Sequence, residues 1–472
     1  MLPILSVEQM RRWERDTWAS GQTEKRVIRL VGQRLAERIL DYSKPGDDIW
    51  IVAGKGHNGD DGRAAVRGLT ERNVTLLNVT DPKRGFVEFS EKLRGCGRNR
   101  PARIIDALFG IGLSRPLKGD WGKLIEALNN SEIPIAAVDV PSGLNADTGE
   151  AEGAAIRAEM TLTVGAPKVG LLKGPEFTGR VETLSDVGFV ECAIDSALMW
   201  TMPEDFAGLP PRRPVASNKG DFGHVAIIAG SHGYHGAAVV SAWGALRARP
   251  GLVTVYPQKN AYVPVAAQLQ SAMVHAWQVG KTPAKNCSTM LFGPGMAADD
   301  VPSSLKKEMR TAWRRSPLAM VVDASALDWL QAGATPAKAI RVITPHPGEA
   351  GRLLGSNAKE VQADRVGALQ EISKKFGGCC VVLKGHQTLV GHSTGKIFVN
   401  SSGNPWLAQG GSGDLLSGYV AGLLAQPDWR RDALLTARFA VWQHGATADR
   451  LWRTSANWTI GELARRLGEE SA

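Results

Sequence analysis

The sequence contains little cysteine and no long apolar run. Its five cysteines form no C-x-x-C pair, and an odd count without that spacing argues against a disulfide framework or a zinc site. No run of about 18 apolar residues occurs, and the first residues lack the apolar core and cleavage pattern of a secretory signal. These absences predict no membrane span and a reducing compartment, so we expect a cytoplasmic protein.

The sequence also lacks a long basic stripe, although basic residues are in excess. Lys and Arg number 56 against 47 Asp and Glu, which gives a formal net charge of +9. This excess would suit nucleic acid, a membrane surface or a small phosphorylated ligand. Because the basic residues are dispersed in short clusters such as Arg212-Arg213, we expect a generally basic surface that binds neither nucleic acid nor a membrane.

The length and the rhythm of apolar runs predict two α/β domains. A chain of 472 residues exceeds what one hydrophobic core usually serves. After a helical start over 1–45, short apolar runs alternate with helical segments, which is typical of a parallel sheet covered on both faces. The expected strands are 49–53, 104–105, 135–138, 224–229, 320–322, 341–344 and 380–383.

Closely spaced prolines near residues 203–218 interrupt this rhythm, as expected of an inter-domain connector. We therefore expect an N-terminal domain over 1–205, a linker over 206–218 and a C-terminal domain over 219–472. The two halves carry different glycine motifs, so no internal duplication is expected.

A glycine-rich segment follows the first predicted strand. Residues 54–62 read GKGHNGDDG and precede a helix expected near Arg63. Such segments present backbone N–H groups to phosphates at the start of a helix. Glycine-rich turns after strands also serve purely structural purposes, so this segment alone leaves both interpretations open.

Two later strands also end in an acid and a glycine-containing loop. Asp106 precedes ALFGIG, and Asp139 precedes VPSG. Because the C-terminal ends of parallel strands line one edge of a sheet, the three segments should converge on one crevice. Asn58, Asp106 and Ser142 offer oxygen ligands for a hard cation, and Asp139 could give and take a proton. Each acid could instead be a loop cap or a helix N-cap.

The N-terminal half resembles the NAD(P)H-hydrate epimerase family through GKGHNGDDG, DALFGIGL and VDVPSG, over roughly residues 1–200. The resemblance implies a Rossmann-like three-layer domain, a potassium ion held by Asn58, Asp106 and Ser142, and Asp139 as the acid/base residue. The implied substrate contacts are His57, Asn58, Gly59, Asp60 and Asp61, followed by Gly110, Ile111, Gly112, Leu113, Ser114, Arg115 and Pro116. The chain departs from the family at His57 and Asp60, and an added carboxylate near a diphosphate is unfavourable unless it faces solvent.

The C-terminal half contains a glycine-rich segment at 404–418, NPWLAQGGSGDLLSG. Its glycines let the backbone approach an anion closely, and a helix expected to begin near Asp414 directs its N–H groups at that anion. A carboxylate there can take a proton from a substrate hydroxyl during phosphoryl transfer. The alternative is an N-capping aspartate at a glycine turn.

Four further segments are expected at the same crevice. The segment 344–349 places His346 between two prolines at a strand end, and 384–388 follows a strand and could hold a nucleotide through its backbone and hydroxyl. Tight glycine loops at 233–237 and 293–295 would admit a flat ligand. A structural histidine and a β-turn with an incidental lysine remain the alternatives for the first two.

The C-terminal half resembles the ADP-dependent NAD(P)H-hydrate dehydratase family, of the ribokinase-like group, through seven ordered motifs from about Lys219 onward: KGDFGH, GSHGYHGAA, FGPGM, VVDASAL, TPHPGE, VLKGHQT and NPWLAQGGSGD. The resemblance implies that Ala237, Gly295, His346 and Asp414 contact the hydrated nicotinamide nucleotide, with Asp414 as the catalytic base. The implied adenine-nucleotide contacts are Lys384, Gly385, His386, Gln387, Thr388 and Gly413. The chain departs from the family at Ser325, Trp406 and Gln409.

The two resemblances together imply a repair reaction on hydrated NADH and NADPH. ADP would phosphorylate the hydroxyl at C6 of the hydrated ring, Mg²⁺ would shield the diphosphate, and loss of phosphate would restore the double bond and leave AMP. Only the S form is expected to fit the dehydratase, which would explain the fused epimerase. We also expect a homo-oligomer.

Two other functions fit parts of the sequence. A ribokinase-like small-molecule kinase would share the G-S-G-D segment, but it has no evident need for the N-terminal domain. Alternatively, His57 and Asp60 have inactivated that domain, which would then be a scaffold beside a working dehydratase.

Overall fold

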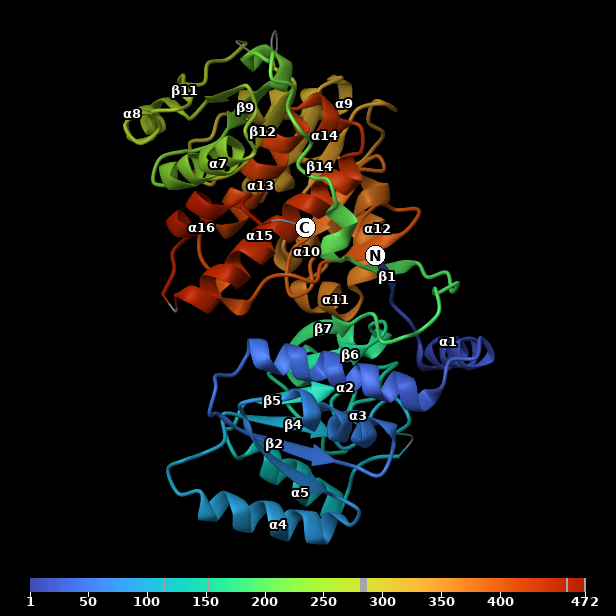
Figure 1. Ribbon diagram of the computed structural model, residues 1–472. Coiled ribbons are helices and arrows are strands. Elements are labelled where there is room, and N and C mark those ends of the chain that lie inside the picture. Colours follow the sequence, from blue (N-terminus) through green and yellow to red (C-terminus); the bar gives the residue numbers. More distant parts are fainter. Residues whose placement is uncertain (114, 152, 281–286, 456, 471–472) are drawn as a thin grey trace. The chain divides into compact units, whose positions relative to one another are not determined.

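The computed structural model describes residues 1–113, 115–151, 153–280, 287–455 and 457–470 (Figure 1). Two compact units divide the chain between Ser196 and Ala197, and Met1 belongs to the second unit. The division lies upstream of the boundary expected at residue 205. The reason is that strand β8 (Leu198–Trp200) pairs with β17 (Ile397–Val399), and Phe206 is buried in the C-terminal core.

The N-terminal unit contains a parallel sheet with the strand order β3-β2-β4-β5-β6-β7. Its strands are β2 (Asp48–Ala53), β3 (Asn73–Asn78), β4 (Arg103–Ala107), β5 (Ile135–Val138), β6 (Met160–Val164) and β7 (Arg180–Leu184). Alternate residues of one strand join different cores, so Ile51 packs with α2 and α3 while Val52 packs with α4 and α5. Burial on both faces explains why these strands are apolar throughout and could be predicted from sequence.

Four helices cover the two faces of this sheet, as Figure 1 shows. They are α2 (Glu24–Asp41), α3 (His57–Ala65), α4 (Pro82–Gly95) and α5 (Asp120–Asn129). The predicted helical start is confirmed as α1 (Val7–Ala19) and α2, separated by a turn at Gly21 and an N-cap at Thr23. Ser6 and Gln9 form a capping box that starts α1.

Helix α3 begins at His57, so the prediction of a helix start near Arg63 was wrong. The glycines in this segment serve close packing instead of a loop, because a Cβ on Gly59 would lie 2.0 Å from the carbonyl oxygen of Gly54. A Cβ on Gly62 would likewise lie 2.7 Å from the Ala107 side chain in β4. Residues 57–61, which the sequence predicted as substrate contacts, therefore form the first turns of helix α3.

The C-terminal unit contains a mixed sheet with the order β11-β10-β9-β12-β13-β14-β15-β16-β17-β8, in which β16 runs antiparallel to both neighbours. Its remaining strands are β9 (His224–Ile228), β10 (Leu252–Val255), β11 (Met273–Val274), β12 (Thr289–Phe292), β13 (Ala319–Val322), β14 (Arg341–Ile343), β15 (Cys380–Leu383) and β16 (Leu389–Gly391). The four strands predicted in this half are confirmed as β9, β13, β14 and β15.

One face of this sheet packs against α7 (His235–Arg247), α13 (Ser412–Leu424), α15 (Ala433–Thr454) and α16 (Ile460–Arg466). Helices α7 and α13 approach so closely that a Cβ on Gly418 would lie 1.9 Å from the Ser241 carbonyl oxygen. Helix α7 begins at His235, so Ala237 lies in a helix and the prediction of a loop through 237 was wrong. No helix in the described part of the chain combines the length and the apolar character that crossing a bilayer requires.

The remaining elements are β1 (Leu2–Pro3), α6 (Pro175–Thr178), α8 (Tyr262–Ala266), α9 (Ser303–Arg315), α10 (Pro347–Leu354), α11 (Ala358–Ala363), α12 (Arg365–Lys375) and α14 (Pro427–Arg430). Among them, α9 buries Leu305, Met309 and Trp313, and α12 packs against β15 and β16.

Candidate functional sites

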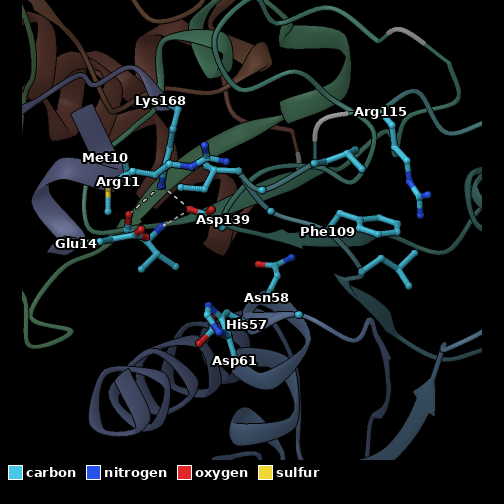
Figure 2. Close-up of a pocket in the computed structure, with 17 residues that line it drawn as sticks. Met10, Arg11, Glu14, His57, Asn58, Asp61, Phe109, Arg115, Asp139 and Lys168 are labelled. Carbon is cyan, nitrogen blue, oxygen red and sulfur yellow. Dashed lines mark hydrogen bonds and ion pairs between the residues drawn. The ribbon is translucent and has the colours of Figure 1, made fainter. Parts of the chain in front are cut away.

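A cavity of about 560 Å³ opens in the N-terminal unit (Figure 2). It lies where the sheet order reverses, because β3 and β4 flank β2 on opposite sides, and ligands bind open α/β sheets at such a switch point. The cavity is lined by nine residues expected from sequence: His57, Asn58, Asp61, Gly110, Ile111, Gly112, Leu113, Arg115 and Asp139. Gly59, Asp60 and Pro116 are not among the lining residues, and Ser114 lies outside the described residues.

His57 and Asp60, where the sequence departs from the family, each pair with another side chain of the protein. Asp60 accepts a hydrogen bond from Arg63 Nη2 at 2.7 Å and keeps 42% of its side chain exposed. His57 Nε2 lies 3.0 Å from Glu24 Oε1 at the start of α2. The added carboxylate therefore has its own counter-charge and does not line the cavity.

Asp106 and Ser142 form one buried hydrogen-bonded unit. Ser142 donates to Asp106 from its backbone nitrogen at 2.8 Å and from its hydroxyl at 2.7 Å. Burial raises the pKa of Asp106 to about 6, although the hydrogen bonds from Ser142 oppose the shift. Asn58 is also buried, and its Nδ2 has no hydrogen-bond partner. These residues form an oxygen-rich, poorly solvated set of the kind that a cation would stabilise.

Asp139 follows β5 with a φ of 65°, a conformation that non-glycine residues seldom adopt outside functional sites. Its Oδ1 accepts from the backbone nitrogen of Val164 at 3.2 Å and from Lys168 Nζ. A Cβ on Gly110 would lie 3.1 Å from Asp139 Oδ2, which places this second oxygen at the cavity. Lys168 is fully buried on the protein side of the same carboxylate.

Two further acids line the cavity beside Asp139. Burial and the neighbouring Asp139 raise the pKa of Glu14, on α1. Burial also raises the pKa of Asp61 well above its ordinary value, and Asp139, Asp60 and Glu14 add to the shift. Three carboxyl groups thus line one cavity, and two of them have raised pKa values.

The sequence analysis missed Glu14 and Lys168 as site residues. Lys168 had a usable signal, because it follows a buried strand of the same sheet as Asp106 and Asp139. Glu14 had none, since an acid on an amphipathic helix normally faces solvent.

The second site lies in the C-terminal unit, where β10 and β12 flank β9 on opposite sides and create another switch point. The loop after β12 meets the start of α7 there. A Cβ on Gly295 would lie 2.3 Å from the Tyr234 carbonyl oxygen and 2.9 Å from the Ala237 side chain. The structure thus brings together Ala237 and Gly295.

Lys384 connects the acids of this site. Its Nζ lies 2.8 Å from Asp323 Oδ1 and 3.8 Å from Glu349 Oε2. Burial alone would lower the pKa of Lys384, but these two carboxylates outweigh burial and raise it. A Cβ on Gly413 would lie 3.2 Å from the same Nζ, so the ammonium group adjoins the glycine-rich start of α13.

Asp414 lies in the first turn of α13, after Gly411 at a φ of 94°. Burial raises the pKa of Asp414 to about 7, with a further contribution from Asp323 that Lys384 partly offsets. A carboxyl group with a pKa near neutrality is well matched to accept a proton during catalysis.

His346 caps the N-terminus of α10. Its Nδ1 accepts from the backbone nitrogens of Gly348 at 3.0 Å and Glu349 at 3.3 Å, and its Nε2 lies 3.5 Å from Glu349 Oε1. The His346 backbone nitrogen donates to Glu349 Oε2 at 2.8 Å. Glu349 therefore links the histidine to Lys384.

Arg365 forms hydrogen bonds with the segment 383–386. Its Nη1 donates to the His386 carbonyl oxygen, and Nη2 donates to the Leu383 carbonyl oxygen at 3.3 Å. Thr388 donates to the Gly385 carbonyl oxygen at 3.1 Å, which closes the turn. Both amide atoms of Gln387 and the Nε of Arg365 are buried without a hydrogen-bond partner. Unsatisfied buried polar atoms are rare, and a ligand is one way to satisfy them.

Four residues of this site were missed in the sequence: Asp323, Glu349, Arg365 and His444. The first two lie in motifs that carried the resemblance, VVDASAL and TPHPGE. His444, on α15, is buried beside Ser412, and burial lowers its pKa to about 4. Nothing local to residue 365 or 444 indicates its place, because each reaches the site from a distant helix.

The two switch-point crevices define a two-domain α/β enzyme, with a Rossmann-like N-terminal unit and a ribokinase-like C-terminal unit. Residues 225–471 match the family model described as NAD(P)H-hydrate dehydratase, and residues 24–170 match the model described as YjeF-related protein N-terminus. The chain belongs to the family of bifunctional NAD(P)H-hydrate repair enzymes.

Individual relatives show how complete the match is. The bifunctional NAD(P)H-hydrate repair enzyme Nnr of Coxiella burnetii is 32% identical, and the alignment covers 95% of each chain. The Escherichia coli enzyme of the same name is 33% identical over 94% of this chain and 88% of the relative. The ADP/ATP-dependent NAD(P)H-hydrate dehydratase of Bacillus subtilis, co-crystallised with ATP and Mg²⁺, is similar in structure with a TM-score of 0.51 and 27% identity. That comparison covers 57% of this chain and 96% of the Bacillus chain.

Proposed function

We propose that the N-terminal site interconverts the R and S forms of hydrated NADH and NADPH. The C-terminal site then dehydrates the S form with ADP, which yields NAD(P)H, AMP and phosphate. The observation that carries the proposal is a shared arrangement at two switch points. In each, an aspartate expected to transfer protons lies close to a lysine, Asp139 with Lys168 and Asp414 with Lys384.

In the C-terminal site, Asp414 acts as the base. Its carboxylate takes the proton of the C6 hydroxyl as that oxygen attacks the terminal phosphorus of ADP, and AMP leaves. The phosphorylated ring then loses phosphate from C6 and a proton from C5, which restores the double bond. Backbone N–H groups at the start of α13, with Gly413, offset the charge of the transferring phosphoryl group.

The nucleotide contacts are Lys384, Gly385, His386, Gln387, Thr388 and Gly413, and the substrate contacts are Ala237, Gly295, His346 and Asp414. The buried, unpartnered amide of Gln387 supports a ligand at this segment. Mg²⁺ fits this site because Asp323 and Glu349 offer carboxylates beside Lys384, and when bound it would shield the charge of the diphosphate. Lys384 holds positive charge at the same place.

In the N-terminal site, Asp139 is the acid/base residue. The proposed substrate contacts are the expected residues that line the cavity, namely His57, Asn58, Asp61, Gly110, Ile111, Gly112, Leu113 and Arg115. Asn58, Asp106 and Ser142 would hold K⁺. They fit a potassium ion because all three side chains offer oxygen and Asp106 is a buried carboxylate. The ion would supply positive charge that stabilises Asp106 and fixes the loops around the substrate.

Within the described residues the cysteines form no disulfide, which supports a reducing, cytoplasmic compartment. The homo-oligomer expected from sequence stays a prediction.

The test mixes purified protein with both epimers of hydrated NADH and follows NADH absorbance after addition of ADP and Mg²⁺. Both epimers are expected to be recovered with ADP, after subtraction of non-enzymatic epimerisation, and the Asp414→Asn variant is expected to recover neither. Recovery of the S form alone would refute the epimerase, and recovery of neither with ADP or ATP would refute the dehydratase.

A further inference from the structure

Helix α1, which carries Glu14, is anchored beside the N-terminal cavity. The backbone nitrogen of Leu5 donates to the Pro167 carbonyl oxygen at 2.9 Å, and that of Val169 donates to the Leu5 carbonyl oxygen at 3.0 Å. The chain segment before α1 is thereby joined to the segment that carries Lys168. At the other side, Trp13 Nε1 donates to the Val190 carbonyl oxygen at 2.9 Å. Glu14 is therefore held in place by its own helix.

Lys168 has no N–H group left to donate a hydrogen bond to a substrate. Its ammonium group donates to Asp139 Oδ1, to Thr163 Oγ1 at 3.0 Å and to the Val164 carbonyl oxygen at 2.9 Å. An ammonium group has three protons, and all three are used. Lys168 thus holds Oδ1 of Asp139 in place and leaves Oδ2 to the cavity.

Glu14 and Asp61 differ in the charges around them. The neighbours that shift the pKa of Glu14 include Asp139, which raises it, and Lys168, His57 and Arg11, which lower it. Every neighbour named for Asp61 raises its pKa, and none is a cation. Cations therefore lie near Glu14, whereas none lowers the pKa of Asp61, so Glu14 is better suited to exchange a proton and Asp61 to donate a fixed hydrogen bond. Figure 2 shows Glu14 grouped with Asp139 and Lys168, and Asp61 grouped with His57.

We propose that Glu14 is the second proton-transfer residue of the N-terminal site, working with Asp139, and that Lys168 positions Asp139. This inference rests on the proposed epimerase function. Both carboxyls line the same cavity, and they come from two separate elements, α1 and the end of β5.

The paired carboxyls suit inversion by ring opening. Asp139 takes the proton of the C6 hydroxyl, the O–H electrons form the carbonyl, and the C6–N1 bond breaks with its electron pair going to N1. Glu14 protonates N1. Rotation about the C5–C6 bond then turns the other face of the carbonyl toward N1. In closing, N1 attacks C6 and returns its proton to Glu14, while Asp139 returns a proton to the oxygen, so both acids end as they began and nothing else is consumed.

The experiment measures conversion of the R form into the S form by chromatography, without ADP, so that the C-terminal site is idle. Glu14→Gln should lower kcat about 100-fold or more with little change in KM, as expected for loss of a general acid. Glu14→Asp should restore part of the rate. Asp61→Asn should cost less in kcat than Glu14→Gln, because an amide still donates a hydrogen bond. Glu8→Gln, an exposed glutamate on the same helix, is the matched control and should behave as wild type.

Lys168→Met should lower kcat with little change in KM, because Asp139 loses the group that holds its Oδ1 in place. Lys168→Arg, which can still donate hydrogen bonds to this oxygen, should restore part of the rate. The exposed Lys173→Met is the control. If Lys168→Met does not fold, Lys168→Gln replaces it in the same assay, and a wild-type kcat in the neutral variant would refute the positioning role.

The outcomes separate this inference from the function on which it rests. No epimerisation by the wild type would refute the function itself. A wild type that epimerises alongside an equally active Glu14→Gln variant would refute the inference alone, as would a larger loss in Asp61→Asn than in Glu14→Gln. Incorporation of one ¹⁸O from labelled water at each inversion would also overturn it, because the hydroxyl would then leave as water and N1 would need no proton.

Discussion

The Asp60 carboxylate lies 2.7 Å from Arg63 Nη2 and 3.3 Å from Arg63 Nε, one turn further along α3. Arg63 Nη1 also donates to the Gly54 carbonyl oxygen at 3.0 Å and to Asn78 Oδ1 at 3.1 Å. The pair thus ties the start of α3 to the ends of β2 and β3. Asp60, one of the two departures from the family, is therefore bonded within the protein.

Replacing Asp60 should therefore change the epimerase little. Asp60→Ala and Asp60→Gly are expected to keep kcat/KM within about threefold of wild type. The cost in unfolding free energy should be at most about 1 kcal/mol, because the pair is exposed and solvent-screened. Steady-state epimerisation and denaturant unfolding measure the two effects, with Asp139→Asn as the inactive reference. A tenfold gain in Asp60→Gly would show instead that the carboxylate repels the substrate.

The dehydratase should depend on pH through Asp414. Because burial raises the pKa of Asp414 to about 7 and a base must be ionised to work, kcat/KM should rise with pH and level off above about 7. Lys384 opposes this shift, so Lys384→Met should move the limb to higher pH and weaken nucleotide binding. The exposed Lys374→Met is the control. An unchanged pH profile in Lys384→Met would argue against an electrostatic interaction between Lys384 and Asp414.

Potassium should stabilise the N-terminal unit. A ligand that binds only the folded state at ten times its Kd adds about 1.4 kcal/mol, which corresponds to about 3–5 °C in Tm for a unit of this size. Differential scanning calorimetry in KCl is compared with choline chloride at equal ionic strength. Asp106→Asn should abolish the difference, and a difference that survives this substitution would place the ion elsewhere.

The close contact between α7 and α13 should be needed for the C-terminal site. A methyl group on Gly418 would lie 1.9 Å from the Ser241 carbonyl oxygen, so Gly418→Ala must push α13 away from α7. We expect a loss of about 1–3 kcal/mol and a fall in dehydratase kcat through displacement of Asp414, with the epimerase unchanged. Gly461→Ala is the control, because its nearest neighbour would be 3.7 Å away. Equal dehydratase rates in the two variants would separate helix packing from catalysis.

Strand positions and motif order were accessible from sequence because they are local properties. Strands buried on both faces are apolar throughout, so 49–53 and 380–383 could be recognised without knowing their neighbours. The glycine motifs were recognisable for the same reason. Their backbone conformation was not, since the sequence alone suggested a loop where α3 already begins at His57.

The fold class, the two-part organisation and the aspartates at which chemistry is proposed follow from the sequence, because periodicity and ordered motifs are local to the chain. The charges around these aspartates follow only from the folded structure. Glu14 lies 125 residues from Asp139 in sequence, and Lys384 lies 61 residues from Asp323, yet each pair is brought together in one site. Electrostatic interactions depend on distance and burial in space, and neither can be read from sequence separation.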